Sequence, residues 1–226
     1  VEELKSMKEF QLLKTKYGYK SSPDLMIPKI LWIKNHEPDI FNRASYYLNI
    51  SDYLNHLICG VIATDSHNAT KFYYSDIEKE YPNKLLKKLD IDLDSLSKVR
   101  NQGDVIGEIL PELSNNFQIP KNCKIILSTY DALAAVVGNG AFKKGDVVDV
   151  SGTVTSIRLV SDKKINDKKN RLYSVRHYNT NYWLHGGSNN LGGGVIEWTK
   201  QLFSMKETSS YKQIDDIINN TPVCPG

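Results

Sequence analysis

The sequence predicts an α/β protein with a mainly helical first part and a second part of short strands followed by a helix. Apolar residues recur at helical spacing through the first 16 residues. Later segments look like strands separated by glycine or charged turns, at 147–150, 155–160, 171–177 and 182–184. The pattern changes near Lys143-Lys144-Gly145, so we expect one domain over residues 1–145 and a second over residues 146–226.

The composition excludes several classes of protein. The 226 residues are 40% hydrophobic and 24% charged, as in an ordinary globular protein. A net charge of +3 is too small to favour nucleic acid as a partner. Cys59, Cys123 and Cys224 lie far apart, without a disulfide framework or a CxxC pair, so we expect reduced thiols in a cytoplasmic protein. No apolar run approaches the roughly 20 residues that cross a bilayer, so we expect no membrane partner.

Helix signals dominate the stretch before residue 100. Ser51 is a good N-cap for a helix over residues 52–58, and Gly60 is a plausible C-cap. Residues 46–50, just ahead of this helix, have the pattern of a strand. Further helices are expected from Pro28 to about residue 36, at 76–89 and at 95–98.

A strand followed by a short helix carries the first candidate for chemistry. Residues 124–128 form an apolar run typical of a buried strand, and residues 132–137 form the helix. Asp131 lies between them, at the carboxyl end of the strand, where α/β sheets bind ligands. The dipole of the following helix favours negative charge there. By position alone, helix capping is the favoured interpretation of Asp131, and catalysis is the alternative.

Two glycine-containing segments are candidates for phosphate contact. Gly152 and Thr153 lie between two strands, where a tight hairpin can turn backbone N–H groups toward a phosphate. A simple hairpin turn is the favoured explanation of this segment. Residues 186–194 contain five glycines ahead of a helix expected over 191–203, and helix N-termini favour anions. A flexible loop explains this glycine cluster equally well.

Four segments together resemble the FGGY carbohydrate kinases. Residues 28–41 are the strongest, because they are similar to the family's PKLLWL and EPEIF patterns. The other matches are residues 51–54 with the family's KDYL, residues 64–70 with its TD-SDASGT and residues 107–112 with its G-L-PE. The order and spacing of all four agree, and the xylulokinase branch is the most similar.

This resemblance implies the actin-like ATPase (ribonuclease H-like) fold and ATP-dependent phosphorylation of a sugar hydroxyl. The strand that ends at Asp131 is similar to the family's GGGDN segment, so Asp131 would be the general base. The SLGTSG hairpin of the family resembles residues 150–153, which implies that Gly152 and Thr153 border the nucleotide. The small-residue helix start implies the same for Gly193. ATP and Mg²⁺ are the expected cofactors, with the metal held largely by nucleotide and water, so no protein ligand is assigned.

The implied partners are a small-molecule sugar, expected to be a ketopentose such as xylulose, and a second copy of the chain as the candidate homodimer. The resemblance covers roughly residues 15–226, which correspond to the middle of the family's enzyme. The family's N-terminal DxGT phosphate loop and C-terminal adenosine site lie outside this stretch. Val1 falls inside a helical pattern without an initiator methionine, and residues 221–226 resemble a loop, so we expect a fragment.

The chain departs from the family's pattern around the predicted base. Ser128, Thr129 and Tyr130 stand in place of the glycines before the aspartate, and Ala132 in place of the amide residue after it. These changes motivate an alternative of another class, a non-catalytic sugar- or nucleotide-binding regulatory module on the same fold. The presence of Asp131 favours the kinase, since a binding module has no need of that carboxylate. A DxGT loop in the upstream coding sequence would distinguish the two.

Overall fold

The structure is a computed structural model that describes residues 1–152, 154–165, 167, 169, 171–178, 181–189, 191–202 and 211–222. The chain forms two compact units, Val1–Ala134 and Ala135–Gly226. The division between these units falls inside one helix, α9 (Asp131–Gly138). The functional boundary near residue 145 that the sequence suggests stays a prediction.

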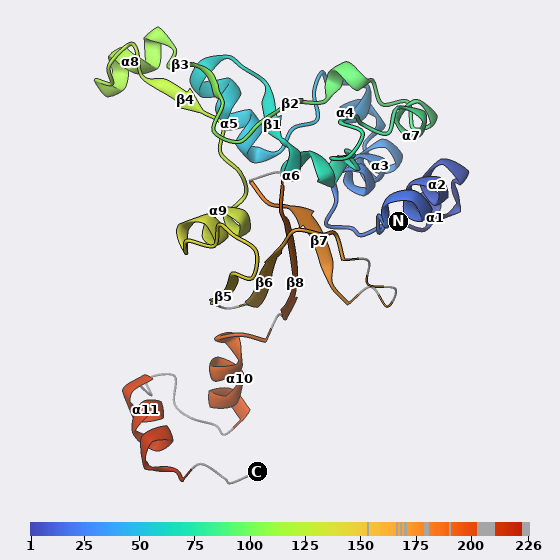
Figure 1. The fold of residues 1–226 in the computed structure, drawn as a ribbon. Helices are drawn as coiled ribbons and strands as arrows, with labels where there is room; N and C mark the ends of the chain where they lie inside the picture. The colour runs from blue at the N-terminus through green and yellow to red at the C-terminus, as the bar shows by residue number, and fades with distance from the viewer. Residues whose placement is uncertain are drawn as a thin grey trace. The chain divides into compact units, whose positions relative to one another are not determined.

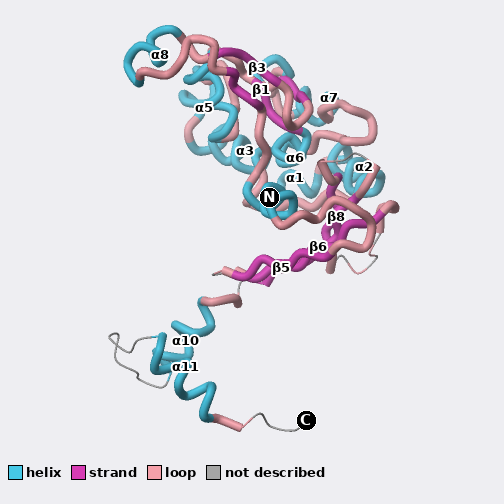
Figure 2. Tube along the Cα trace, turned by 60° about the vertical axis from the view of Figure 1, so that its left-hand side comes forward, coloured by secondary structure: helices cyan, strands magenta, loops and turns pink. Residues whose placement is uncertain are grey.

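The first unit is mainly helical and contains two pairs of short strands (Figure 1). At one end of this unit lie α8, β3 and β4, and at the other lie α1, α2 and α7, as a second view also shows (Figure 2). Its elements before α9 are α1 (Glu2–Ser6), α2 (Lys8–Tyr17), α3 (Met26–His36), α4 (Pro38–Arg43), α5 (Ile50–Cys59), β1 (Ala63–Asp65), α6 (Ser66–Ala69), η1 (Thr70–Phe72), α7 (Asn83–Lys88), η2 (Leu93–Ser95), β2 (Lys98–Arg100), β3 (Val105–Glu108), α8 (Pro111–Phe117) and β4 (Lys124–Ile126).

The core of the first unit is built from helix faces. On α3, the buried residues Ile27, Ile30 and Leu31 recur at helical spacing, which confirms the helix predicted at Pro28. Each side chain of this kind contributes about 1.5–3 kcal/mol when fully buried. The buried members of this core are Leu4, Phe10, Ile27, Ile30, Leu31, Phe72, Tyr73, Leu85, Leu86, Leu89, Ile91 and Leu96.

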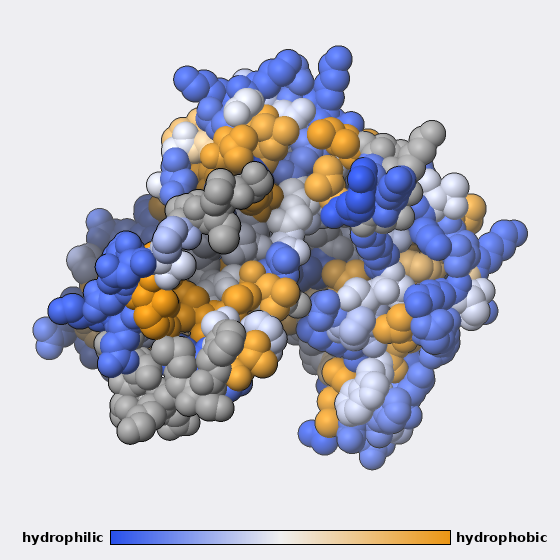
Figure 3. Space-filling view, turned by 90° about the horizontal axis from the view of Figure 1, so that it is seen from below, coloured by the Kyte–Doolittle hydropathy of each residue, from blue (hydrophilic) through white to orange (hydrophobic). Residues whose placement is uncertain are grey.

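Helix α5 buries one acidic residue, Asp52, and one core cysteine, Cys59, and exposes several apolar side chains. Its N-cap is Asn49, which forms a capping box with the buried Asp52, so the predicted cap at Ser51 is wrong by two residues. Gly60 ends the helix with φ 75°, as predicted. The exposed apolar residues of α5 are Ile50, Tyr53, Leu54 and Leu57. Figure 3 shows patches of apolar side chains on one face of the molecule.

The strands of the first unit are short. Strands β1 and β2 pair in parallel, and β3 and β4 pair antiparallel. The strand predicted at 46–50 is reduced to one bridge between Tyr47 and Leu96. The helix predicted at 76–89 covers only α7, because the chain before it makes a turn in which Lys79 adopts φ 58°. The strand predicted at 124–128 is β4, but Ile126 is 57% exposed, so it is not a buried strand.

After the end of α9, the second unit contains a four-stranded antiparallel sheet in the order β5-β6-β8-β7 (Figure 1). Each of the four predicted strands is present, but β8 continues to Asn189, five residues past the predicted end at 184. An added Cβ at Gly186 would lie 2.2 Å from the backbone oxygen of Ile157, so the sheet needs glycine there. The strands are β5 (Val147–Ser151), β6 (Thr155–Ser161), β7 (Tyr173–Arg176) and β8 (Trp183–Asn189).

Two helices follow the sheet, α10 (Gly194–Leu202) and α11 (Tyr211–Asn220). Strand β8 runs through the first two glycines of the predicted 186–194 loop, so only the later glycines precede the helix. The hydroxyl of Tyr211 donates to Glu197 Oε1 at 2.8 Å, which joins α11 to α10. Helix α11 was not predicted from the sequence pattern.

Candidate functional site

Asp131 is the first residue of α9 and is exposed to solvent. The carbonyl oxygen of Tyr130 accepts the first helical hydrogen bonds, from the amides of Leu133 and Ala134, both at 3.1 Å. The carboxylate of Asp131 accepts from the Ala132 amide at 2.6 Å. The carboxylate lies at the N-terminal end of the helix, and the residue is open to solvent. Asp131 is therefore the first residue inside the helix and not its N-cap, and its exposed carboxylate contacts the next backbone amide.

The segment that leads to Asp131 is held on both sides. Leu127, 3% exposed, exchanges backbone hydrogen bonds with the loop after β2: its carbonyl accepts from Gly103 and its amide donates to Asp104, each at 2.9 Å. Two residues later, the Thr129 hydroxyl donates to Asp65 Oδ1 at 3.0 Å. The path of the chain between β4 and α9 is thus fixed by one backbone pair and one side chain.

Asp65 is the centre of a buried polar cluster that we call the Asp65 cluster, made of Asp65, His67, Asn68, Gln102 and Thr129. Asp65 is 1% exposed and ends β1, where it caps α6 by accepting from the His67 amide at 2.9 Å. Asn68 Nδ2 donates to Asp65 Oδ2 at 2.6 Å. Gln102 Nε2 donates to Asp65 Oδ1 at 3.2 Å and lies 2.7 Å from His67 Nδ1.

The electrostatics of Asp65 follow from these contacts. Burial by itself raises the pKa of a carboxyl group, because it penalises the charged form. The contacts of Asp65 with His67, Asn68 and Thr129 outweigh burial, and the pKa of Asp65 lies below its ordinary value. Asp65 is therefore an ionised, fully engaged acceptor and is itself no candidate for proton transfer.

In the second unit, the structure brings together two of the glycines that the sequence singles out. The amide of Gly193 donates to the carbonyl of Gly152 at 2.6 Å, and the amide of Gly152 donates to Val154 O at 3.0 Å. An added Cβ at Gly193 would lie 3.1 Å from Gly152 O, so glycine permits this close approach. Both N–H groups are already used, so this contact forms a close-packed wall and not a pair of free N–H donors.

Thr153 lies outside the residues that the structure describes. Asp131 belongs to the first unit, and Gly152 and Gly193 belong to the second. The sequence pointed to these four residues and did not point to the Asp65 cluster beside the segment that carries Asp131. Residues 64–70 could have pointed to the cluster, because they match a motif of the resembling family. Gln102 gave no such signal, because its position depends on the loop after β2, which bonds to the backbone of Leu127.

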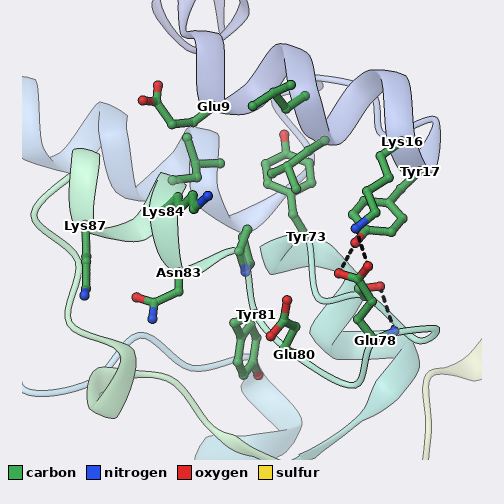
Figure 4. A pocket seen from close by; sticks show the side chains of 15 residues that line it. Glu9, Lys16, Tyr17, Tyr73, Glu78, Glu80, Tyr81, Asn83, Lys84 and Lys87 are labelled. Carbon is green, nitrogen blue, oxygen red and sulfur yellow. Dashed lines mark hydrogen bonds and ion pairs between the residues drawn. The ribbon is translucent and has the colours of Figure 1, made fainter.

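A pocket of about 500 Å³ lies elsewhere in the first unit, between α2 and residues 73–87 (Figure 4). Lys16 and Tyr17 both point to Glu78 and bond to it. Burial raises the pKa of Tyr73, which lines the pocket, to about 12. The lysines and glutamates that line the pocket are matched in number, so its charge does not favour a phosphate: Lys16, Lys84, Lys87, Glu9, Glu78 and Glu80.

Within the described part of the chain, no group of three or more His, Cys, Asp or Glu side chains is placed to hold a metal ion. None of the described helices is long and apolar enough to cross a membrane.

Comparison with known proteins agrees with this architecture. The N-terminal domain of the FGGY family of carbohydrate kinases matches residues 1–138. Xylulose kinase of Bacillus subtilis (strain 168) is 24% identical over 87% of this chain, and gluconokinase of Bacillus licheniformis is 26% identical over 85%. The chain spans only 39% and 37% of those two relatives.

A ligand-bound xylulose kinase from Lactobacillus acidophilus superposes with a TM-score of 0.81 and 25% identity, over 94% of this chain and 43% of that structure. The mixture of helices and sheets is therefore part of the actin-like ATPase fold, as the resemblance implied. A family match over more than half of the residues, together with this fold, leads to one conclusion. The chain belongs to the FGGY family of carbohydrate kinases.

Proposed function

We propose that the parent protein of this chain phosphorylates a sugar hydroxyl at the expense of ATP, with Asp131 as the general base. The observation that carries the proposal is the position of Asp131: an exposed carboxylate at the first turn of α9, at the end of a segment fixed by neighbouring elements. Membership of a carbohydrate kinase family supports the class of reaction.

In the proposed step, a carboxylate oxygen of Asp131 accepts the proton of the sugar hydroxyl. The sugar oxygen forms a bond to the γ-phosphorus, and the bond from that phosphorus to the bridging oxygen of ADP breaks. Magnesium held by nucleotide and water would shield the phosphate charge. A metal bound in this way does not depend on a cluster of acidic protein ligands.

The second unit would contribute a wall to the nucleotide site. Gly152 and Gly193 meet through their backbones and carry no side chains that would keep a ligand away. We propose that they border the nucleotide together with Thr153. Because their N–H groups already have partners, the charge of the phosphates would be met by other groups.

The substrate proposed first is a ketopentose such as xylulose. A xylulose kinase is among the relatives in sequence and among the similar structures. Gluconokinases match to a comparable degree, so gluconate belongs in any substrate panel.

A second candidate function is a non-catalytic sugar- or nucleotide-binding module. Thr129 favours it, because its hydroxyl occupies Asp65 at a position where the resembling kinases have glycine. The exposed carboxylate of Asp131 opposes it, since a binding module has no use for a base at the end of this segment.

The test is ATP turnover by the full-length parent with ketoses, aldoses, polyols and gluconate. We expect sugar-dependent turnover that falls by roughly a hundredfold or more in Asp131→Ala, the scale of a lost general base. Asp39→Ala is the matched control, because Asp39 is an exposed aspartate in the first turn of α4. If the parent protein is folded but turns over ATP with none of the sugars, the binding-module proposal replaces the kinase proposal.

A further inference from the structure

Thr129 is the direct link between the Asp65 cluster and the segment that carries Asp131. The other members of the cluster come from the end of β1, from α6 and from the loop after β2. Thr129 comes from the stretch between β4 and α9, and it lies two residues before Asp131. The Thr129 hydroxyl therefore gives the Asp65 cluster a direct hydrogen bond to the segment that carries Asp131.

The partner of Thr129 is rigid. Asp65 is 1% exposed, Asn68 is 4% exposed, and both backbone and side-chain donors hold the carboxylate from other directions. A buried carboxylate with several charge-assisted hydrogen bonds has little freedom to move. The hydroxyl of Thr129 is thus anchored to a fixed point and not to a mobile surface group.

The next residue is also constrained. The ring of Tyr130 lies 6.0 Å from the ring of His67, and the Lys71 ammonium lies 5.9 Å from the Tyr130 ring centroid. Asp65, His67 and Lys71 belong to β1, α6 and η1, which follow one another directly in the chain, so Thr129 and Tyr130 both contact the stretch 65–71. The carbonyl of Tyr130 then starts α9.

We propose that Thr129 is a positioning residue, whose hydroxyl bond to Asp65 sets the backbone that aims Asp131 at the reacting hydroxyl. The inference rests on the proposed function, because it assumes Asp131 as the base. The threonine stands at a place where the resembling kinases have glycine, which has no side chain to make such a bond. Displacing a catalytic group by about 1 Å can cost on the order of a hundredfold in rate.

The experiment compares Thr129→Val, Thr129→Ala and Thr129→Ser in the full-length parent with sugar and ATP. Valine keeps the shape and removes the hydroxyl, whereas serine keeps the hydroxyl. We expect kcat to fall by roughly tenfold to hundredfold in the valine and alanine variants, with KM for the sugar nearly unchanged. Serine should restore most of kcat. Thr15→Val is the matched control, because Thr15 Oγ1 bonds only the Gln11 carbonyl within α2.

The outcomes separate the two proposals. If Asp131→Ala keeps full turnover, the proposed base is wrong, whatever Thr129 does. If Asp131→Ala is inactive while valine and serine at 129 behave alike, the positioning role is overturned and the base stands. If valine and alanine both fail to fold while serine folds, the hydroxyl serves stability, and the positioning role is likewise overturned.

Discussion

The carboxylate of Asp65 accepts hydrogen bonds from backbone amides and from three side chains while almost wholly removed from water. A buried charge is tolerated only when such partners replace the lost solvent. Asp52, also 1% exposed, has fewer strong partners: Ser97 Oγ donates at 2.8 Å, and Asn49 donates at 3.3 Å. For Asp52, burial outweighs these bonds and raises the pKa. The contributions of Asp65 and Asp52 to the stability of the first unit therefore change with pH in opposite directions.

This difference predicts how stability changes with pH. The folded pKa of Asp65 is below its unfolded value, so its contribution is present above that unfolded value, near 4, and is lost as the pH falls. The free energy of unfolding lost in Asp65→Asn should therefore be largest at pH 7 and should shrink below about pH 4. Urea unfolding at several pH values measures it.

Asp52→Asn is the control for this pH experiment. The folded pKa of Asp52 is raised, so its stabilising contribution is full below the unfolded value and is lost as the pH rises through the folded value. The cost of Asp52→Asn should grow as the pH is lowered. If the stability cost of both substitutions changed with pH in the same direction, the opposite pKa shifts of Asp65 and Asp52 would be contradicted.

The sequence showed part of the site, and the physical reason differs from residue to residue. Asp131 could be predicted as a candidate site residue because it lies between a predicted strand and a predicted helix. The contact of Gly152 with Gly193 was not visible, since it joins residues that are 41 positions apart, counting from 152 to 193. Gln102 was hidden for the same reason: its partner Asp65 belongs to another strand end, and no periodic pattern encodes that meeting.

At the scale of the element, β8 depends on a glycine inside the sheet. Gly186 pairs with Arg158 on β6 and Tyr173 on β7, and an added Cβ would meet the Ile157 carbonyl, which belongs to the backbone and cannot move aside. Gly187 differs, because its added Cβ would find the Arg171 carbonyl at 3.9 Å, an ordinary contact. Neighbouring glycines in one strand thus have unequal roles.

We predict that Gly186→Ala destabilises the second unit by about 1–3 kcal/mol or more, as overpacking does. Gly187→Ala should change the free energy of unfolding by less than about 1 kcal/mol. Denaturant unfolding followed by circular dichroism compares the two. Equal losses would show that the close approach at Gly186 relaxes without cost.

The elements that the sequence predicted well are those with a strong local pattern. The four strands of the second unit and helix α3 were found from alternation and helical spacing. The prediction of a strand at 46–50 was wrong, because this stretch forms a single bridge, Tyr47–Leu96, in place of a paired strand. For the early glycines of 186–194 the sequence left a loop and a close backbone approach equally open, and only the packed sheet reveals that close approach requires glycine at 186.

At the scale of the whole molecule, each unit has buried residues of its own. Leu86 on α7 is 0% exposed and belongs to the core of the first unit. Leu184 on β8 is 1% exposed and lies opposite Val160 on β6 and Val175 on β7. These leucines form a matched pair, because each is wholly buried within a different unit.

We predict that Leu86→Ala and Leu184→Ala each remove about 2–5 kcal/mol from the stability of their own unit. Amide hydrogen exchange should accelerate within residues 1–134 for the first variant and within the second unit for the other. Accelerated exchange throughout the chain in either variant would instead indicate a single cooperative fold.

The bond between Thr129 and Asp65 has a consequence for the history of the sequence. A hydroxyl at 129 gains its partner only if the carboxylate at 65 is already in place, so the effects of changes at these two positions should not add. Glycine at 129 has more backbone freedom but cannot form the bond to Asp65. Glycine and threonine at this position therefore suit different surrounding sequences. The order in which such replacements arose is therefore constrained, and this pair is a place to look for epistasis among members of the family.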